Sequence, residues 1–237
     1  MSSTELHAPP QRDDRATRAY EQLRELIVHG RLAPGTWIIE SDIATRLGVS
    51  RTPVRAALQR LEQEGYIVGT ARGQQYRAAV SPLTREDARE LFAIVGELEA
   101  LAARSAAALP AAPRATLAAD LRTLNDRMRA ASLPRPDQNL LFDADTAFHL
   151  RYVVAGSGPR LLALHQAIKP QAERYIRLYY SALVDEIAIS LSEHEVILDA
   201  IRRGEAEAAQ LAVEVNWRNA AERLQRVIDS VGERGSW

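Results

Sequence analysis

From Thr84 onward, apolar residues recur at the spacing of amphipathic helices, and no stretch shows the alternation of a β-strand. The first helix is expected to start at Thr84, where Thr84 and Asp87 resemble a capping box, and to end near Leu109. The following helices are expected at residues 113–132, 136–155, 159–183, 192–203 and 205–231. Because the intervening loops are short, this part is predicted to be an antiparallel helical bundle.

The first third of the chain has a different pattern. A helix is expected at residues 15–29 and a short strand at residues 37–39. Ser41 is a candidate N-cap for a second helix that Gly48 ends, and Ser50 is a candidate N-cap for a third helix reaching about Glu64. A β-hairpin with strands at 66–68 and 75–80 follows. Three helices and a hairpin predict a winged helix-turn-helix.

The predicted fold class is therefore mainly α, with a winged helix-turn-helix followed by an all-α antiparallel bundle. The domain boundaries expected from the sequence are a flexible tail at 1–13, a winged helix-turn-helix domain at 14–80, a linker at 81–83, an all-helical domain at 84–232, and a tail at 233–237.

Composition excludes several classes of protein. With 46% hydrophobic and 26% charged residues, a chain of 237 residues is expected to be globular. No run approaches the 18 to 20 or so apolar residues of a membrane span, and the N-terminus lacks the apolar core of a signal peptide. The absence of cysteine rules out disulfides and Cys-ligated zinc. A cytoplasmic location without membrane contact is expected.

The net charge of −1 argues against a nucleic-acid coat, but basic residues are unevenly placed. Residues 41–60 contain Arg46, Arg51, Arg55 and Arg60 against Asp42 alone. Such a local basic stripe on a nearly neutral protein is typical of a compact DNA-binding module.

Residues 48–58, with the sequence GVSRTPVRAAL, lie at the start of the third helix. Ser50 and Thr52 can bind phosphate at a helix N-terminus, and Arg51 and Arg55 are expected on the face opposite Val54. Such a face fits a major groove, where an arginine can recognise guanine. The alternative is that this is only a solvated, charged helix face. The DNA-binding interpretation is favoured because the helix cap, the short turn, the wing and the basic stripe all occur together here.

This segment resembles the GntR family of bacterial transcription regulators, and the similarity covers about residues 15–80. The resemblance implies that Ser50, Arg51, Thr52 and Arg55 touch DNA. It also implies that the wing, at Arg72-Gly73, enters the adjacent minor groove. One departure is Ser41, where some members have a DNA-contacting arginine. A homodimer that binds an inverted repeat is expected, and repression is the commoner mode in the family.

The second half is similar to the effector-binding FCD domain of one branch of that family. Many such domains hold a divalent metal ion with one Asp and three His. The resemblance places the ligands at Asp145, His149 and His194, with Asn216 at the fourth position in place of His. Zn, Ni or Mn is the expected ion. Because an amide is a weaker ligand than imidazole, the alternatives are a loosened site, a site for harder ions, or an empty polar cavity.

The expected effector is a small organic acid. Many relatives bind it with an arginine, but Val95 stands at the equivalent position, so ordinary dicarboxylates are expected to bind weakly. Arg151, Arg174 and Tyr175 are candidate effector contacts, and the alternative is that they lie at the surface or the edge of the core.

Enzymatic function is not expected, because the sequence lacks a cysteine nucleophile, a phosphate-binding glycine loop and an H-E-x-x-H motif. Two alternatives are a metal-free regulator that responds to acyl-CoA and a metal-dependent hydrolase using Asp145, His149 and His194.

Overall fold

The computed structural model describes residues 12–72, 75–132, 135–183 and 186–235. The chain divides into two compact units: residues 1–82 together with 234–237, and residues 83–233. The start of the expected N-terminal tail lies outside the described residues. The chain end from Arg234 groups with the first unit, whereas the sequence suggested only a tail there.

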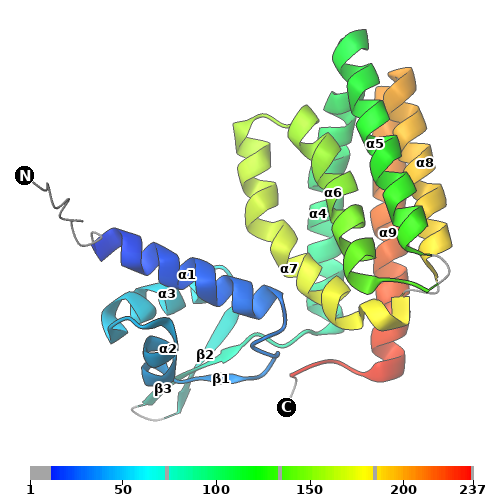
Figure 1. The fold of residues 1–237 in the computed structure, drawn as a ribbon. Coiled ribbons are helices and arrows are strands. Elements are labelled where there is room, and N and C mark those ends of the chain that lie inside the picture. Colours follow the sequence, from blue (N-terminus) through cyan, green and yellow to red (C-terminus); the bar gives the residue numbers. More distant parts are fainter. Residues whose placement is uncertain (1–11, 73–74, 133–134, 184–185, 236–237) are drawn as a thin grey trace, which may run out of the picture. The chain divides into compact units, whose positions relative to one another are not determined.

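The first unit is a winged helix-turn-helix, as predicted. Its strands form one antiparallel sheet in the order β1-β3-β2, with Trp37 opposite Ala79 and Ile67 opposite Val80. Apolar faces of the helices and the sheet share one core, in which Leu23, Val54 and Leu61 are fully buried. Its elements are α1 (Arg12–Val28), β1 (Trp37–Ile38), α2 (Glu40–Leu47), α3 (Arg51–Gln63), β2 (Ile67–Arg72) and β3 (Gln75–Val80) (Figure 1).

The turn between α2 and α3 depends on Gly48, whose φ of 65° lies in the left-handed region that glycine adopts without strain. Ser50 occupies the N-cap of α3 as expected, although its hydroxyl makes no capping hydrogen bond. The prediction that Ser41 caps α2 is wrong. The helix begins at Glu40, because the extended residue Ile39 already accepts the first backbone hydrogen bonds.

The second unit is an all-helical bundle, as predicted. Within the described residues, α4 contacts α6, α7, α8 and α9, and α5 packs against α6 and α8 (Figure 1). None of the described helices is long and apolar enough to cross a membrane. The helices are α4 (Arg85–Ala107), α5 (Ala111–Ala131), α6 (Gln138–Gly156), α7 (Pro159–Leu183), α8 (Ile187–Arg203) and α9 (Ala206–Val231).

Several helix starts differ from the sequence expectation, and α6 and α8 illustrate the causes. Helix α6 begins after Asp137, whose side chain accepts hydrogen bonds from the backbone N–H groups of Asn139 and Leu140. Helix α8 begins at Ile187 instead of Ser192, because Ile187 and Leu191 are buried in a side cluster of the core. Tertiary packing thus adds a helical turn that the local sequence does not signal.

Small residues bring α4 and α6 into close contact. Ala102, Ala103 and Ala106 of α4 are fully buried. A Cβ atom built on Gly156 would overlap the backbone carbonyl oxygen of Ala102. Because backbone cannot move aside as a flexible side chain can, the last residue of α6 has to be glycine for this packing.

We expect Gly156→Ala to lower the free energy of unfolding by about 1–3 kcal/mol, the usual cost of overpacking. This cost exceeds the gain of up to about 1 kcal/mol that alanine gives over glycine in a helix. Urea unfolding followed by circular dichroism measures the difference. Gly158→Ala is the matched control, because its Cβ would meet no atom within 4 Å. Equal stability of the two variants would contradict the close approach.

Candidate functional site

The outer face of α3 carries the residues expected to contact DNA. Ser50, Arg51, Thr52 and Arg55 are all exposed. The opposite face is buried in the core of the first unit, through Val54, Ala57, Leu58 and Leu61. The helix therefore presents two arginines and two hydroxyl groups on a surface that packing leaves open.

Arg55 is held by an ion pair within the first unit. Its Nε and Nη2 atoms donate hydrogen bonds to the two carboxylate oxygens of Glu40, at 3.1 and 2.9 Å. These hydrogen bonds lower the pKa of Glu40. Because a two-point contact fixes the plane of a guanidinium group, Glu40 orients Arg55 on this exposed surface.

The predicted basic stripe is partly neutralised. Arg60 donates to Glu64 at 2.9 Å and stacks over the ring of Tyr20, with its Cζ atom 3.7 Å from the ring centroid. With Arg55 held by Glu40, the local charge is smaller than the sequence count suggests.

The wing is described only in part. The backbone of Arg72 ends β2 and lies opposite Gln75. The side chain of Arg72 and all of Gly73 lie outside the described residues.

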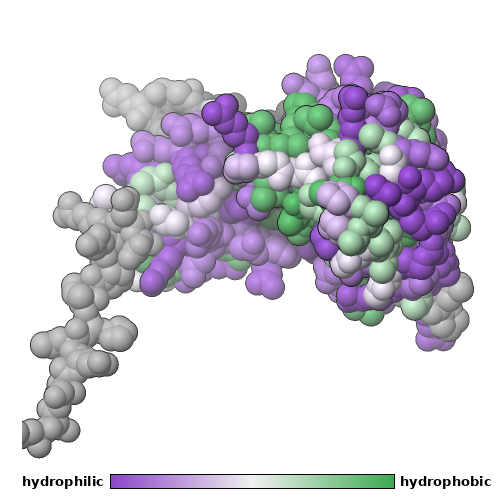
Figure 2. Space-filling model, turned by 90° about the horizontal axis from the view of Figure 1, so that it is seen from above, coloured by the Kyte–Doolittle hydropathy of each residue, from purple (hydrophilic) through white to green (hydrophobic). Residues whose placement is uncertain are grey.

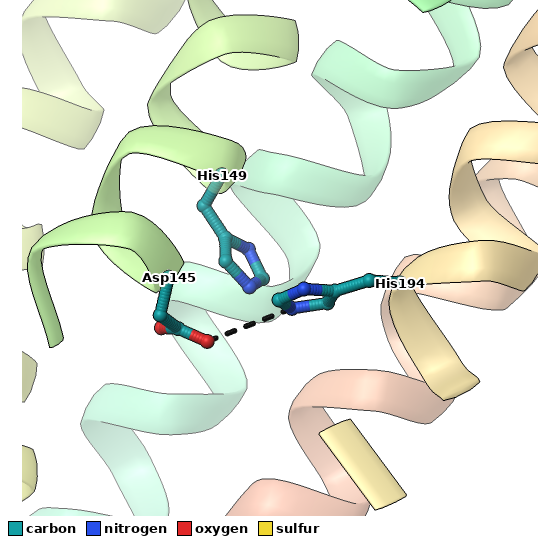
Figure 3. A group of neighbouring side chains, drawn as sticks. All are labelled: Asp145, His149 and His194. Atoms are coloured by element: carbon teal, nitrogen blue, oxygen red, sulfur yellow. Dashed lines mark ion pairs between the residues drawn. The ribbon is translucent and has the colours of Figure 1, made fainter. Parts of the chain in front are cut away.

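In the second unit, α6 and α8 bring three candidate metal ligands together. Asp145 and His149 lie one turn apart on α6, and His194 approaches from α8 (Figure 3). One potential ligand atom from each residue lies within 4.8 Å of the others. Ligands bound to one ion at about 2.0–2.2 Å are at most about 4.4 Å apart, so a small closure completes such a site.

Both histidines are held with their Nε2 atoms available. His149 donates from Nδ1 to Glu99 at 2.6 Å, and His194 donates from Nδ1 to the Asn125 side-chain oxygen at 3.2 Å. The Asn125 amide is fixed in turn, because its Nδ2 donates to Glu195 at 2.8 Å. Metal-binding histidines in proteins usually have this second hydrogen bond, which sets the tautomer and the ring orientation.

The residues present fit a metal ion. The Nε2 atom of His194 is buried without a hydrogen-bond partner and lies 3.5 Å from a carboxylate oxygen of Asp145. Burial and the neighbouring His149 lower the pKa of His194 well below its usual value, which keeps the ring neutral. A neutral imidazole with an unpaired buried nitrogen is the form that binds a cation.

Asn216 lines the same cavity as Asp145 and His149. Its Nδ2 atom donates to Glu193 at 2.8 Å, and Glu193 also receives hydrogen bonds from Asn219 and Arg223. With its nitrogen committed to Glu193, the Asn216 amide offers its oxygen as the remaining polar atom.

Sequence reasoning missed Glu99, a fully buried carboxylate behind His149. Burial opposes its ionisation, but Lys169 and then His149 outweigh that cost and hold its pKa well below the usual value. Glu99 interrupts the apolar stripe of Leu91 and Val95 at helical spacing, which is the signal that could have revealed it. Its hydrogen-bond donors are His149, Tyr152, His165, Lys169 and Trp217.

The candidate effector contacts lie elsewhere in the helical unit. Arg151 donates to Asp120, and Tyr175 donates to Asp87 while accepting from the Thr84 backbone N–H. Arg174 is buried. None of the three is among the described residues that line the cavity beside Asp145. Val95 is fully buried in the main core and is likewise not among the described residues that line this cavity.

These two units define a class of protein: a DNA-binding regulator with a winged helix-turn-helix and a helical effector-binding domain. The family model described as "Bacterial regulatory proteins, gntR family" matches residues 15–74, and the FCD domain model matches residues 90–219.

Similar proteins agree with these matches. The probable D-xylose utilization operon transcriptional repressor of Paenarthrobacter nicotinovorans is 30% identical over 207 residues, which cover 83% of this chain and 84% of the relative. An uncharacterized HTH-type transcriptional regulator in an unstable DNA locus of Streptomyces ambofaciens is 29% identical over 208 residues, which cover 88% of this chain and 84% of the relative. The solved structure of E. coli McbR/YncC matches with a TM-score of 0.70 at 21% sequence identity. The match covers 90% of this chain and 97% of the E. coli chain, and it supports the fold.

The chain therefore belongs to the GntR family of bacterial regulatory proteins, in the branch with an FCD domain. It is a transcriptional regulator, and relatives in this family are regulators and not enzymes. The hydrolase alternative is thereby excluded.

We expect Lys169→Met to lower the free energy of unfolding by about 3–5 kcal/mol, because Glu99 would remain charged and buried without its main countercharge. The double variant Glu99→Gln, Lys169→Met is expected to lose less than the sum of the two single variants, since neither charge remains. Urea unfolding of all four proteins provides the cycle. Strict additivity would show that Glu99 and Lys169 are not coupled.

Proposed function

We propose that this protein is a repressor that binds an inverted-repeat operator as a homodimer, through Ser50, Arg51, Thr52 and Arg55 of each α3. The exposed polar face of α3 is the observation that carries this proposal. Ser50 and Thr52 bind backbone phosphates at the helix N-terminus, and the arginines read base edges. Arg72 and Gly73 of the wing reach the neighbouring minor groove. Such a regulator acts on DNA in the cytoplasm.

Dimerisation is favoured by the small footprint of one winged module, since two-fold symmetric proteins match symmetric operators. Hydrophilic surface on the helical unit is interrupted by apolar area (Figure 2). Large apolar side chains that remain at least half exposed in this unit include Leu101, Val154 and Leu164. Exposed apolar surface of this kind supports a protein interface.

Operator binding is expected to depend on Arg55. Arg55→Ala should cost about 1–3 kcal/mol on an operator selected from a random library, with a smaller loss on unrelated DNA. Arg226→Ala is the control, because Arg226 is an exposed arginine paired with Glu186 in the helical unit. Fluorescence anisotropy with both DNAs measures the affinities. Equal losses on both DNAs would make Arg55 a phosphate contact, and an asymmetric single half-site would contradict the homodimer.

We further propose that Asp145, His149, His194 and Asn216 hold a divalent ion in the effector domain. Two imidazoles, a carboxylate and an amide oxygen form a harder ligand set than one Asp with three His. Compared with a site of one Asp and three His, this set shifts the preference from Zn²⁺ or Ni²⁺ toward Mn²⁺. When bound, the ion supplies positive charge and open coordination positions for an organic acid.

Metal affinity is expected to follow these ligands. Asn216→His should tighten Zn²⁺ and Ni²⁺ binding about tenfold or more, and His149→Ala should abolish stoichiometric uptake. Because protons compete for imidazole and the pKa of His194 lies well below its usual value, metal affinity should fall only as the pH drops well below about 6.5. Metal titration with elemental analysis tests this, with His29→Ala as the control because His29 is at the end of α1, in the other unit. Unchanged metal content in His149→Ala would overturn the site.

In the proposed mechanism, an effector in the helical unit changes the spacing of the two DNA-binding units and releases the operator. An effector shifts this equilibrium only through its different affinity for the two states, and a tenfold loss of operator affinity requires about 1.4 kcal/mol of coupling. The cavity beside Asp145 has a volume of about 70 Å³. This volume favours a small acid over acyl-CoA as the effector.

A further inference from the structure

Glu40 connects the two helices of the helix-turn-helix at their solvent-exposed surface. It is the first residue of α2, and its partner Arg55 lies 15 residues further along the chain, in α3. The side chain of Arg55 is 64% exposed and that of Glu40 is 29% exposed. Because an ion pair this open to solvent contributes little to the stability of a fold, stability of the first unit is a poor explanation for the pair.

The contact uses one edge of the Arg55 guanidinium group and leaves another edge open. Nε and Nη2 each donate to one carboxylate oxygen of Glu40, at 3.1 and 2.9 Å. A guanidinium group has five N–H groups, so this contact leaves two on Nη1 and one on Nη2. Nη1 and Nη2 form the fork that can donate to O6 and N7 of guanine. Arg55 can therefore bind Glu40 and a guanine at the same time.

The two hydrogen bonds to Glu40 prepare Arg55 for a base contact. Two parallel hydrogen bonds fix the plane of a guanidinium group. An arginine without such a partner loses the rotational freedom of its side chain when it binds, which weakens the complex. Arg55 therefore approaches DNA with its Nη1–Nη2 fork already oriented.

The charge of Glu40 also favours a base contact over a phosphate contact. Attraction to phosphate depends on positive charge and carries no sequence information. Glu40 compensates the charge of Arg55, and its own carboxylate is repelled by phosphate. Hydrogen bonds from Nη1 and Nη2 to a base edge need no net charge. The pair is therefore better suited to recognise a base than to bind the DNA backbone.

An acidic residue at this position also has a simple local explanation, because a carboxylate in the first turn of a helix is stabilised by the helix dipole. Asp42 lies in the same turn of α2 and is exposed. It accepts a hydrogen bond from the Ser41 hydroxyl at 3.2 Å. Glu40 differs from Asp42 in its two hydrogen bonds from Arg55. Asp42 is therefore the matched comparison for the role of Glu40.

We propose that Glu40 is a positioning residue that determines operator specificity. It holds Arg55 so that Nη1 and Nη2 face one guanine in each operator half-site, and its charge prevents Arg55 from acting as a phosphate contact. This inference rests on the proposed DNA-binding function of α3.

Selection of operators from a random DNA library by the full-length protein, followed by sequencing, tests the proposal. The wild type is expected to require guanine at one position of each half-site. Glu40→Gln should lower that preference about tenfold, the usual effect of losing one two-point base contact, and leave the other positions unchanged. Asp42→Asn removes the same charge from the same turn and should keep the wild-type profile. An unchanged profile in Glu40→Gln, or the same loss in both variants, would overturn the proposal.

Binding to unrelated DNA provides a readout that a purely structural role of Glu40 would not produce. In Glu40→Gln, Arg55 is released and can contact phosphate, so affinity for unrelated DNA should rise. The plot of log affinity against log salt concentration should become steeper by about 0.9 for one added phosphate contact. Asp42→Asn should keep the wild-type slope. Fluorescence anisotropy over a salt series measures both quantities, and weaker binding of Glu40→Gln than of the wild type to unrelated DNA would contradict the proposal.

A double-variant cycle tests whether Glu40 acts through Arg55. Glu40→Gln should not change the selected profile once Arg55→Ala is present, because no guanidinium group remains to be oriented. Urea unfolding should give similar midpoints for all four proteins, since the ion pair is exposed. A further loss of guanine preference from Glu40→Gln in the Arg55→Ala background would exclude the positioning role.

Failure of this inference is distinguishable from failure of the proposed function. If Arg55→Ala loses the guanine preference and Glu40→Gln keeps it, only the inference is wrong. If the wild type selects no operator, or if Arg55→Ala selects the same operator as the wild type, the proposed role of Arg55 is wrong and the inference fails with it.

Discussion

The helical unit is organised around the buried carboxylate of Glu99. Burial alone opposes ionisation of this group, and Lys169, 3.2 Å away, is the main source of compensation. A buried ion pair is weak evidence for stability, because apolar residues of similar volume can often replace it without loss. The role of Glu99 is to orient His149. The Nδ1 atom of His149 donates to a carboxylate oxygen of Glu99 at 2.6 Å, and this hydrogen bond sets which ring nitrogen faces the cavity.

The fold followed from the sequence because local signals and packing agree over most of the chain. Gly48 ends α2 in the left-handed region, and Thr84 caps α4 by accepting from the Asp87 backbone N–H. Where the local sequence signal and the tertiary packing disagree, the packing determines where the helix begins. Ile187 and Leu191 extend α8 toward its N-terminus because both are buried, although Ser192 resembles a cap when the sequence is considered alone.

The candidate metal ligands were predictable because the resemblance to the FCD domain implies them, whereas the groups that orient them were not. Glu99, Asn125 and Glu193 act through contacts with residues 23 to 70 positions away in the chain. No local pattern encodes such partners. Glu99 had a weak signal, a charge in an apolar helical stripe.

The origin of the site residues has a consequence for regulation. Asp145 and His149 come from α6 and His194 from α8, while their orienting partners Glu99 and Asn125 come from α4 and α5. A ligand that draws the side chains together therefore acts on four helices at once. Because packed helices shift between discrete arrangements more readily than they deform, binding energy at this point can be converted into a change of bundle geometry. A site confined to one helix could not produce such a change, since moving its ligands together would leave the packing of the other helices unchanged.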